Sequence, residues 1–583
     1  MALSCFIKPK IHTSIDMIKL LNLHIIILTL ITSTIYSQQV PRETFLFPMD
    51  ITPSVSGSFA ELRTNHFHSG IDLSTHGKMG VPVKSMEKGT VSRIKVSPVG
   101  YGNAVYIKHP NGYTTVYGHL RNYAPKIDSV ITAEQYKIKS FAIDFFPSTE
   151  IEIKKGEIIG YSGNSGSSGG PHLHYEIRDT ETEEPMNPFF FQNKIKDDVR
   201  PKIMNIRLYP LDNKSSINGS PSAKNYPVVF YDGAYHLKGN PTIYASGKIG
   251  LGIEMLDYMS GSWNKCGLYK LNMKVNNLVY YSWELNRFSF DESRYINSHI
   301  DYAYKAKYGK RFERCFRQPG NQLRIYGEMH NNGIILMDTL KTVQISAFDA
   351  ANNLAYLKFK LLKGKTPNTP TVVGSKLSYT TAHILKNEGI QCLIPQGALY
   401  EDAIIQLSKK RGPANKLFYE IGDPYTPLHT YMNISILIPD SLKEMGNKVC
   451  LATIQHSNKA NYAGGKINND SIHLATRSFG KYTFAIDSIP PTIRAQQNIR
   501  GRVFPLHSKL SFKIHDDFSG IASYECLLNK KWTLCEYDAK TNRLTCPLSK
   551  APVEKGKQYN FELIITDNCG NEKTLESYFT TGN

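Results

Sequence analysis

The chain is built from short runs of β-branched and aromatic residues that end at Gly, Pro or Asn. Between residues 41 and 195 these runs include GTVSRIKV (89–96), NAVYIKH (103–109) and TTVYGHL (114–120). The turn sequence HPNGY at 109–113 lies between the last two, which is typical of antiparallel strands joined by a tight turn. Tyr and Phe number 35 and 26, and aromatic residues favour strands. We therefore predict an all-β protein whose residues 41–195 form one compact antiparallel domain.

The strand-rich pattern continues after this domain, with turns at the spacing expected of β-sandwich modules. We predict β-sandwich (Ig-like) modules at 200–365 and 488–583, with a further β-rich module at 366–487 between them. In the middle module, IPQGALYEDAIIQL (394–407) is similar to a ZU5-type β module. By fold-level analogy, the modules serve adhesion, wall binding or positioning of the first domain.

A weak internal repeat links the first and last of these modules. DYMSG (257–261) recurs as DFSG (517–520), and SAFDAANN (346–353) resembles ITDNCGN (565–571). Members of the second pair each close a strand-rich block, which supports the prediction of β-sandwich modules in both places.

The first 37 residues have the composition of an export signal. An apolar run from Leu20 to Ile35 follows Lys19, and it is followed by Ser37 and Gln38. We predict that residues 1–37 are a signal peptide and that the protein is exported to the periplasm or the cell envelope, or is secreted. An uncleaved membrane anchor is the alternative, although the apolar run is short for a bilayer span.

The formal net charge of +19 is an indication of partners rather than of fold. A basic surface suits an anionic polymer such as nucleic acid, a membrane surface or cell wall. The sequence has no helical basic stripe and no RNA-binding signature, so we do not expect a nucleic-acid partner.

Nine cysteines are present, of which Cys5 lies in the predicted signal segment. The other eight permit disulfides in an exported chain. None belongs to a CxxC pair, which argues against a cysteine zinc cluster. The four in the last sixty residues are the best candidates for local pairing: Cys526, Cys535, Cys546 and Cys569.

Three short motifs carry residues suited to metal chemistry. HSGID contains His68 and Asp72, YGHL contains His119, and GPHLHYE contains His172 and His174. Residues two apart in a strand point to the same face, so the HLH pair can face one cleft. A catalytic zinc takes about three protein ligands and leaves one position open. His68, Asp72 and one histidine of the HLH pair would supply them, and His119 and the other histidine would remain for water and substrate.

In this order, H-x-G-x-D, Y-x-H-L and G-x-H-L-H-x-E resemble the lysostaphin-type (LytM-like) zinc endopeptidases of peptidoglycan. The resemblance covers about residues 55–190. It implies one Zn²⁺ ion per chain, ligated by the residues that match the family ligands, and two catalytic histidines. The implied ligands are His68, Asp72 and His174, and the implied catalytic residues are His119 and His172. No HExxH motif is present, so the helix-borne zincin arrangement does not apply.

Other polar residues near these motifs have competing interpretations. We expect His66, His76 and His109 to be structural, with His109 in the HPNG turn. Glu176 lies two residues after His174 and on the same strand face, so it is either an orienter of a ligand histidine or an ordinary surface residue. The sequence GNSGSSGG (163–170) lacks the Lys-Ser/Thr of a phosphate loop and is read as a flexible turn before the HLH strand.

The spacing between His119 and His172 is long, and the excess lies at about 123–150. This insertion is predicted to be an extra wall of the substrate groove, a self-inhibitory flap or a docking arm for a protein partner. The function implied by the resemblance is hydrolysis of amide bonds in peptidoglycan stem peptides or cross-bridges. The alternatives are a catalytically silent wall-binding protein or activator of other wall hydrolases, and a secreted peptidase that acts on other proteins.

Overall fold

The computed structural model describes residues 45–191, 194–366, 376–412, 416–454 and 459–582. The predicted signal segment and its cut site lie outside these residues. Within the described part of the chain, no helix is both long and apolar enough to cross a bilayer.

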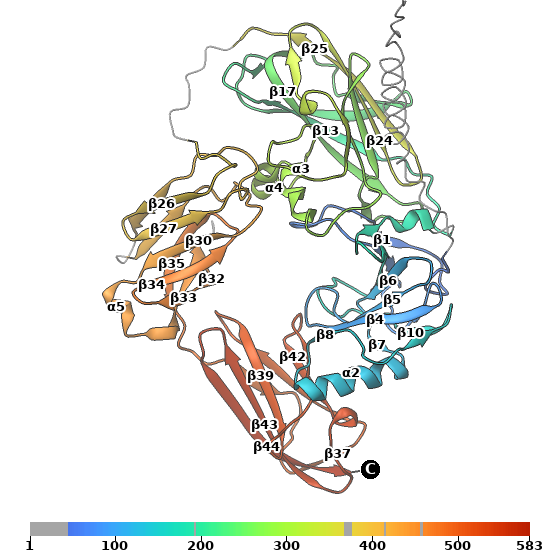
Figure 1. Cartoon of the computed structure of the whole chain (residues 1–583), viewed down its shortest axis with the longest axis vertical. Helices are drawn as coiled ribbons and strands as arrows, with labels where there is room; N and C mark the ends of the chain where they lie inside the picture. Colours follow the sequence, from blue (N-terminus) through green and yellow to red (C-terminus); the bar gives the residue numbers. More distant parts are fainter. Residues whose placement is uncertain (1–44, 192–193, 367–375, 413–415, 455–458, 583) are drawn as a thin grey trace, which may run out of the picture. The chain divides into compact units, whose positions relative to one another are not determined.

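Residues 45–191 are organised around a nine-stranded sheet and a smaller three-stranded sheet (Figure 1). Their strands are β1 Val55–Gly57, β2 Ile71–Ser74, β3 Pro82–Lys84, β4 Gly89–Val96, β5 Ala104–Lys108, β6 Tyr113–Gly118, β7 Asn122–Tyr123, β8 Ile143–Phe145, β9 Glu152–Ile153, β10 Ile158–Tyr161, β11 His172–Asp179 and β12 Pro185–Met186. The large sheet has the order β1-β2-β11-β6-β5-β4-β8, with β12 beside β11 and β9 beside β4. The small sheet has the order β3-β10-β7. The predicted antiparallel β domain is confirmed in this region.

The centre of the large sheet is buried, which fixes the strands that carry the motifs. Strand β6 is buried along its whole length, and β11 is buried at all but its two end residues. Val116, Tyr117, Leu173 and Tyr175 are fully buried on these two strands. The HLH strand therefore has a hydrogen-bonded neighbour on each side, β2 and β6.

The predicted insertion folds into a helix and an edge strand. Helix α2 (Pro125–Ile138) begins with a proline, whose fixed φ suits the first helical turn, and ends at Lys139 in a left-handed conformation. It buries Ile127, Ile131 and Gln135, which share one helical face. Strand β8 pairs with β4 and so extends the large sheet. A helix here was not predicted from the sequence.

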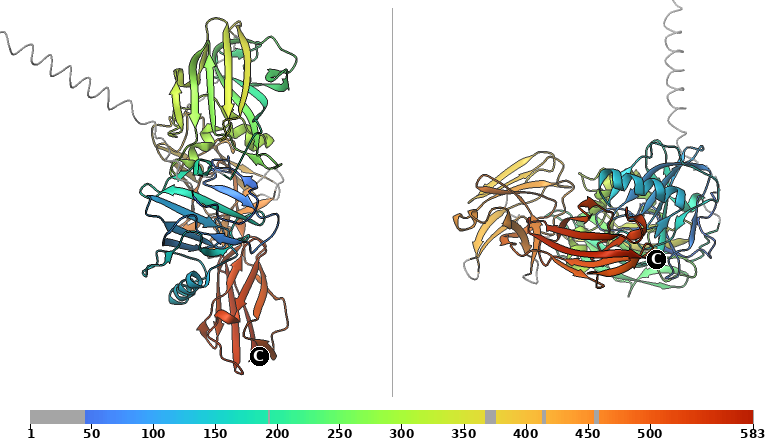
Figure 2. Two further views of the ribbon diagram at one scale, coloured as in Figure 1. Left: turned by 90° about the vertical axis from the view of Figure 1, so that its right-hand side faces the viewer. Right: turned by 90° about the horizontal axis from the view of Figure 1, so that it is seen from below.

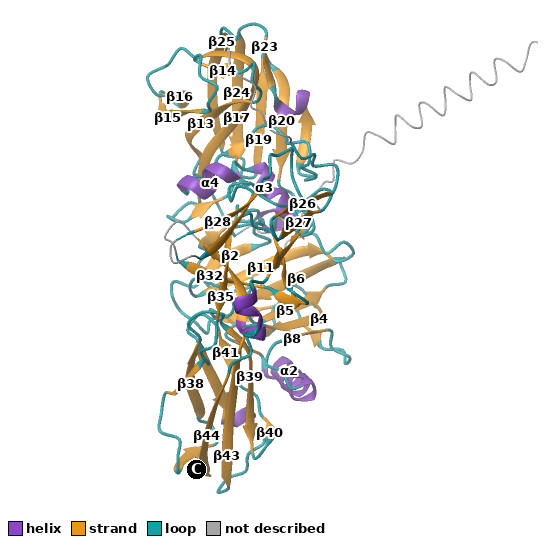
Figure 3. Cartoon of the chain, turned by 90° about the vertical axis from the view of Figure 1, so that its left-hand side faces the viewer, coloured by secondary structure: helices purple, strands orange, loops and turns teal. Residues whose placement is uncertain are grey.

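The remaining residues are also strand-rich, as Figure 3 shows by secondary structure. Residues 202–363 contain a thirteen-stranded sheet whose main path is β14-β17-β13-β15-β16-β25-β24-β19-β20-β22. Its elements are β13 Lys202–Pro210, β14 Ser216–Ile217, β15 Lys224–Tyr231, β16 Ala234–Leu237, β17 Tyr244–Tyr258, β18 Lys265–Cys266, β19 Lys270–Val275, β20 Leu278–Glu284, β21 Glu313–Arg314, β22 Tyr326–Met329, β23 Ile335–Met337, β24 Lys341–Phe348 and β25 Leu354–Lys363, with short helices α3 Ile296–His299 and α4 Tyr302–Tyr308.

Two further blocks each consist of two sheets around a shared core, seen from other sides in Figure 2. The first contains β26 His383–Asn387, β27 Ile390–Ile394, β28 Leu407–Arg411, β29 Leu417–Ile421, β30 Met432–Leu437, α5 Asp440–Lys443, β31 Val449–Ile454, β32 Ala460–Gly464, β33 Lys466–Asn468, β34 Ser471–Thr476 and β35 Gly480–Ile486. The last contains β36 Thr492–Ala495, β37 Arg502–Pro505, β38 Lys509–His515, β39 Ile521–Leu528, β40 Lys531–Trp532, β41 Glu536–Asp538, β42 Arg543–Pro547, β43 Gln558–Asp567 and β44 Glu572–Gly582. In this last core, Phe512 and Phe561 stack with ring centroids 5.1 Å apart. The all-β prediction is confirmed.

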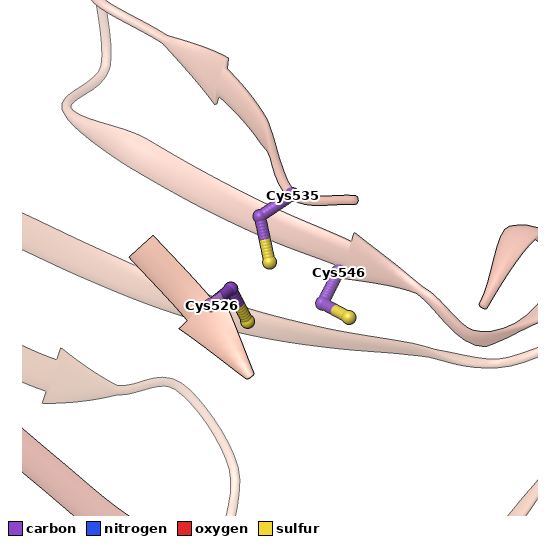
Figure 4. A group of neighbouring side chains, drawn as sticks. All are labelled: Cys526, Cys535 and Cys546. Atoms are coloured by element: carbon purple, nitrogen blue, oxygen red, sulfur yellow. The ribbon is translucent and has the colours of Figure 1, made fainter. Parts of the chain in front are cut away.

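Three of the four cysteines named as candidates for local pairing lie together in the last block. The eight cysteines in the described residues are free and buried. Cys526 lies in β39, Cys546 lies in β42, and Cys535 lies between β40 and β41. The sulfur atoms of these three residues lie within 4.8 Å of one another (Figure 4). Cys569 is not a member of this group. Because a disulfide uses two sulfur atoms, no more than one can form within the group.

Candidate metal centre

Strand pairing brings the three sequence motifs to one place. Asp72 of β2 lies opposite His174 of β11 in the antiparallel register. On the other side of β11, His174 lies opposite Gly118, the last residue of β6. His119 follows Gly118 directly, so the YGHL motif ends beside the HLH motif.

One atom from each of His68, Asp72 and His174 meets at a common point. His68 Nε2 lies 3.1 Å from Asp72 Oδ1 and 3.0 Å from His174 Nδ1. His174 Nδ1 lies 2.9 Å from Asp72 Oδ1. The three residues are buried, with exposed fractions of 7%, 7% and 3%. Two nitrogens and one oxygen without a thiolate form a ligand set that suits Zn²⁺.

The second nitrogen of each ligand-type histidine is held by an acceptor, which fixes the tautomer. His68 Nδ1 lies 2.7 Å from the carbonyl oxygen of Ser58, which can only accept, so Nδ1 carries the proton. His174 Nε2 lies 2.9 Å from Glu176 Oε1 and donates to it. When both rings are neutral, as metal binding requires, the lone pairs on His68 Nε2 and His174 Nδ1 therefore point to the common point. This arrangement of outer acceptors is typical of metal-binding histidines.

The electrostatics at this point also fit a cation. Burial disfavours the charge of Asp72, but His68 and the neighbouring His172 and His174 outweigh it and hold the pKa of Asp72 well below its usual range. Burial opposes protonation of His174, but hydrogen bonds with Asp72 and Glu176 raise its pKa to about 9. Two carboxylates thus favour positive charge on or beside His174.

His119 and His172 lie next to this group. Burial, followed by the neighbouring His174 and His172, lowers the pKa of His119 to about 3. Its Nδ1 donates to the Ser165 carbonyl at 2.9 Å, which leaves the Nε2 lone pair available. His172 Nδ1 lies 2.8 Å from the Gly170 carbonyl, and its Nε2 lies 3.4 Å from Asp72 Oδ1. His172 Nε2 is buried and has no hydrogen-bond partner among the described residues.

The backbone of His119 is held in an unfavourable conformation. Its φ of +57° lies in the left-handed region, which costs about 1–3 kcal/mol for a residue other than glycine. Such outliers cluster at functional sites. The imidazole rings of His119 and His172 lie with centroids 4.8 Å apart.

Glu176 is part of the centre, and the surface interpretation of this residue is wrong. Its side chain is fully buried, and its Oε1 accepts from Ser69 at 2.5 Å and from Tyr101 at 2.6 Å, besides His174. Its Oε2 accepts from Arg178 Nε at 2.6 Å. Burial opposes the carboxylate, but Arg178 and His174 outweigh it and hold the pKa of Glu176 well below its usual range.

Arg178, Tyr101 and Arg63 were missed by reasoning from the sequence. Arg63 Nη2 donates to Asp72 Oδ2 at 3.1 Å, so the oxygen that faces away from the common point is also paired. A signal for Arg178 was present, because the alternation H-x-H-x-E-x-R from 172 to 178 places all four side chains on one strand face. No sequence signal identifies Arg63 or Tyr101.

The rival histidines lie outside the group. His66 Nδ1 lies 2.8 Å from the Thr64 carbonyl, and His76 is exposed. His109 is buried, with Nδ1 on the Lys88 carbonyl at 2.8 Å and Nε2 on Thr115 Oγ1 at 2.7 Å. Both nitrogens of His109 are therefore satisfied, in agreement with a structural role.

Gly70, the glycine of H-x-G-x-D, is required by close packing. A Cβ atom at this position would lie 2.2 Å from the Tyr175 carbonyl oxygen of β11. Any larger side chain would push the HSGID segment away from the HLH strand. Within the glycine-rich loop, Gly166 combines a φ of +67° with an approach of 2.3 Å to the Gly100 carbonyl, whereas Gly169 has open space. Close packing therefore explains part of this loop, and flexibility does not explain all of it.

A cavity of about 860 Å³ opens at the centre. Its lining includes the five residues of the three motifs: His68, Asp72, His119, His172 and His174. Arg63 and Tyr101 also line it. A substrate in this cavity would therefore reach the common point, His119 and His172.

Two family models match the chain, and the first covers this site. Peptidase family M23 matches residues 66–136 and 146–188, which contain all three motifs. Residues 66–188 form a peptidase family M23 domain. The resemblance predicted for residues 55–190 is thereby confirmed. The second match, the Zu5-like domain, covers residues 374–487 and lies in the segment where the sequence is similar to a ZU5-type module.

The M23 domain has relatives that are named as peptidases. DD-carboxypeptidase/endopeptidase Mpg of Neisseria meningitidis serogroup B is 35% identical over 127 residues, which are 22% of this chain and 23% of that protein. Peptidoglycan DD-endopeptidase ShyA of Vibrio cholerae is 29% identical over 137 residues, 22% of this chain and 26% of that protein. The catalytic domain of lysostaphin from Staphylococcus simulans is 22% identical, with a TM-score of 0.19 over 24% of this chain and 91% of that domain. The chain thus spans about a quarter of the length of the first two relatives.

Proposed function

We propose that the M23 domain hydrolyses amide bonds in peptidoglycan stem peptides or cross-bridges, with a zinc ion held by His68, Asp72 and His174. The observation that carries the proposal is the convergence of His68 Nε2, Asp72 Oδ1 and His174 Nδ1, with both tautomers fixed by outer acceptors. The relatives named as peptidoglycan DD-endopeptidases support the substrate class. Such a substrate agrees with the predicted export to the cell envelope.

The chain's own residues supply the remaining chemistry. When bound, zinc supplies Lewis acidity toward the scissile carbonyl and toward water. His119 is neutral because of its lowered pKa, so its Nε2 can take a proton from the attacking water. His172 Nε2, which has no hydrogen-bond partner in the described chain, can orient that water or stabilise the oxyanion. No covalent intermediate is required.

Metal removal tests this proposal directly. We expect the purified protein to release peptide-cut fragments from isolated peptidoglycan, to stop after chelation and to recover with added zinc. Mass spectrometry of the fragments would identify the bond. Zinc bound at one per chain without cleavage would favour a silent wall-binding protein or activator. Cleavage of a casein control but not of peptidoglycan would favour a peptidase of other proteins, and no bound metal would contradict the proposal.

Replacement of His119 should separate catalysis from metal binding. We expect His119→Ala to lower kcat by about 10²–10⁴-fold, the usual contribution of a general acid–base group. Zinc content should stay at one per chain, because His119 is outside the group of three converging atoms. Steady-state rates on peptidoglycan and metal analysis of the same sample check this. Loss of zinc together with activity would instead make His119 a ligand.

A further inference from the structure

Three aspartates of the block that follows the M23 domain are far apart in the sequence but lie close together in the structure. Asp197 precedes β13, Asp257 lies in β17, and Asp349 follows β24. One carboxylate oxygen of each lies within 4.8 Å of those of the other two. Asp257 and Asp349 are each only 2% exposed. All three line a cavity of about 180 Å³.

These carboxylates have no positive partner among the described residues. None of the ion pairs found there involves Asp197, Asp257 or Asp349. Asp257 Oδ1 and Asp197 Oδ2 are buried and have no hydrogen-bond partner in the described chain. Burial, followed by the charges of Asp349 and Asp197, raises the pKa of Asp257 to about 8. Buried carboxylates in such a group require either a proton or a cation.

The same arrangement occurs a second time, in the last block. There Asp487, Asp516 and Asp567 also place one oxygen each within 4.8 Å of the others. The sequences correspond: D-x-x-x-P-x-I begins at 197 and at 487, and D-x-x-x-N begins at 349 and at 567. The motif D-x-x-S-G begins at Asp257 and at Asp516. Asp257 therefore corresponds to Asp516, and not to Asp517, which is the first residue of DFSG in the predicted repeat.

The asparagine hydrogen bonds of the two groups correspond, whereas Asp516 Oδ2 accepts from Phe518 N, Ser519 Oγ and Gly520 N and Asp257 Oδ1 has no hydrogen-bond partner in the described chain. The Asn353 side-chain amide donates to Asp349 Oδ2 at 2.8 Å and to the Asp197 carbonyl at 3.0 Å. Asn571 donates to Asp567 Oδ2 at 2.7 Å and to the Asp487 carbonyl at 3.0 Å. In both groups the asparagine thus ties the segment that enters the block to the loop after a long strand. The arrangement is therefore a built feature of the fold, present twice.

We propose that Asp197, Asp257 and Asp349 bind a calcium ion. Carboxylate oxygens are the ligands that hard divalent cations prefer. Calcium accepts six to eight oxygens in irregular geometry, so it can use these carboxylates and water, whereas magnesium demands a near-ideal octahedron. The ion would neutralise three like charges that repel one another. It would also fasten Asp197, in the segment after the M23 domain, to strand β17 and to the loop after β24.

Calcium titration of the purified, zinc-loaded protein tests this proposal apart from hydrolytic activity. We expect calcium to raise the melting temperature by about 3 °C or more when its concentration greatly exceeds Kd. In calorimetric titration, Asp257→Asn and Asp349→Asn should each lose one of the parent's calcium equivalents, or bind it at least tenfold more weakly. Asp198→Asn is the matched control, because Asp198 is adjacent and exposed but outside the group. It should bind calcium as the parent does.

A crossover in stability distinguishes binding from a merely structural role. Asp257→Asn keeps the shape of the side chain and removes a carboxyl group whose ionisation burial and the other two aspartates oppose. Without calcium it should therefore melt at or above the parent's temperature, and with calcium it should melt below it. The proposal is overturned if calcium leaves the parent's melting temperature unchanged at 10 mM. It is also overturned if Asp257→Asn and Asp349→Asn retain all of the parent's binding, since the ion would then lie elsewhere.

Discussion

Replacement of His174 by alanine is expected to remove zinc binding and peptidoglycan hydrolysis together. His174 Nδ1 lies 3.0 Å from His68 Nε2 and 2.9 Å from Asp72 Oδ1, so it supplies one of the three converging lone pairs. A catalytic zinc site relies on about three protein ligands. Loss of an outer partner alone costs about 10–100-fold in affinity or activity, so loss of a ligand should exceed about 100-fold in both. Metal analysis and hydrolysis rates measured on one sample check this.

Two neighbouring histidines serve as matched controls. His66→Ala should retain one zinc per chain, because His66 lies on the same segment as His68 but outside the converging group. His76→Ala, at an exposed position, should retain both zinc and activity. If His66→Ala lost the metal and His174→Ala kept it, the proposed ligand set would be wrong.

The sequence was sufficient to infer that His172 and His174 point to the same face of the sheet, because side-chain direction in a strand repeats every two residues. That rule requires only that residues 172–179 form a strand, as β11 does. It also groups Glu176 and Arg178 with the histidines. Whether Glu176 was buried could not be decided, because this depends on strands β2 and β6 on both sides and on the counter-charge of Arg178.

Contacts between segments that are far apart in the sequence could not be predicted from local sequence patterns. Asp72 faces His174 because β2 and β11 pair in one register, although about a hundred residues separate them. Cys526, Cys535 and Cys546 likewise meet only because the sheets of the last block face each other. A slip of one residue in either case would turn the side chains to the other face.

Helix α2 was missed for a different reason. Its buried face has only two apolar residues, Ile127 and Ile131, and the third buried residue is the polar Gln135. An amphipathic helix normally shows three or four apolar residues in two turns. The pattern was therefore too weak to separate a helix from a loop, and the proline at its start was an isolated signal.

Replacement of Glu176 by alanine should cause a large loss of stability in the M23 domain. The side chain is fully buried and joins His174, Ser69 and Tyr101 to Arg178, which is 4% exposed. Without Glu176 the Arg178 guanidinium would be a buried charge without its main partner. Breaking a buried pair in this way costs about 3–5 kcal/mol. Urea denaturation, followed by near-ultraviolet dichroism of the buried tyrosines, measures the change.

The effect should depend on burial rather than on charge pairing in general. Glu87→Ala removes a surface pair, in which Glu87 Oε2 lies 2.5 Å from Lys155 Nζ, and should cost no more than about 1 kcal/mol. Removing Arg178 as well, in Glu176→Ala with Arg178→Met, should restore part of the stability because no unpaired charge remains. Zinc affinity should stay about 10–100-fold lower in this double variant, since His174 Nε2 still lacks its acceptor. Recovery of stability and zinc affinity together would contradict a role of Glu176 in orienting His174.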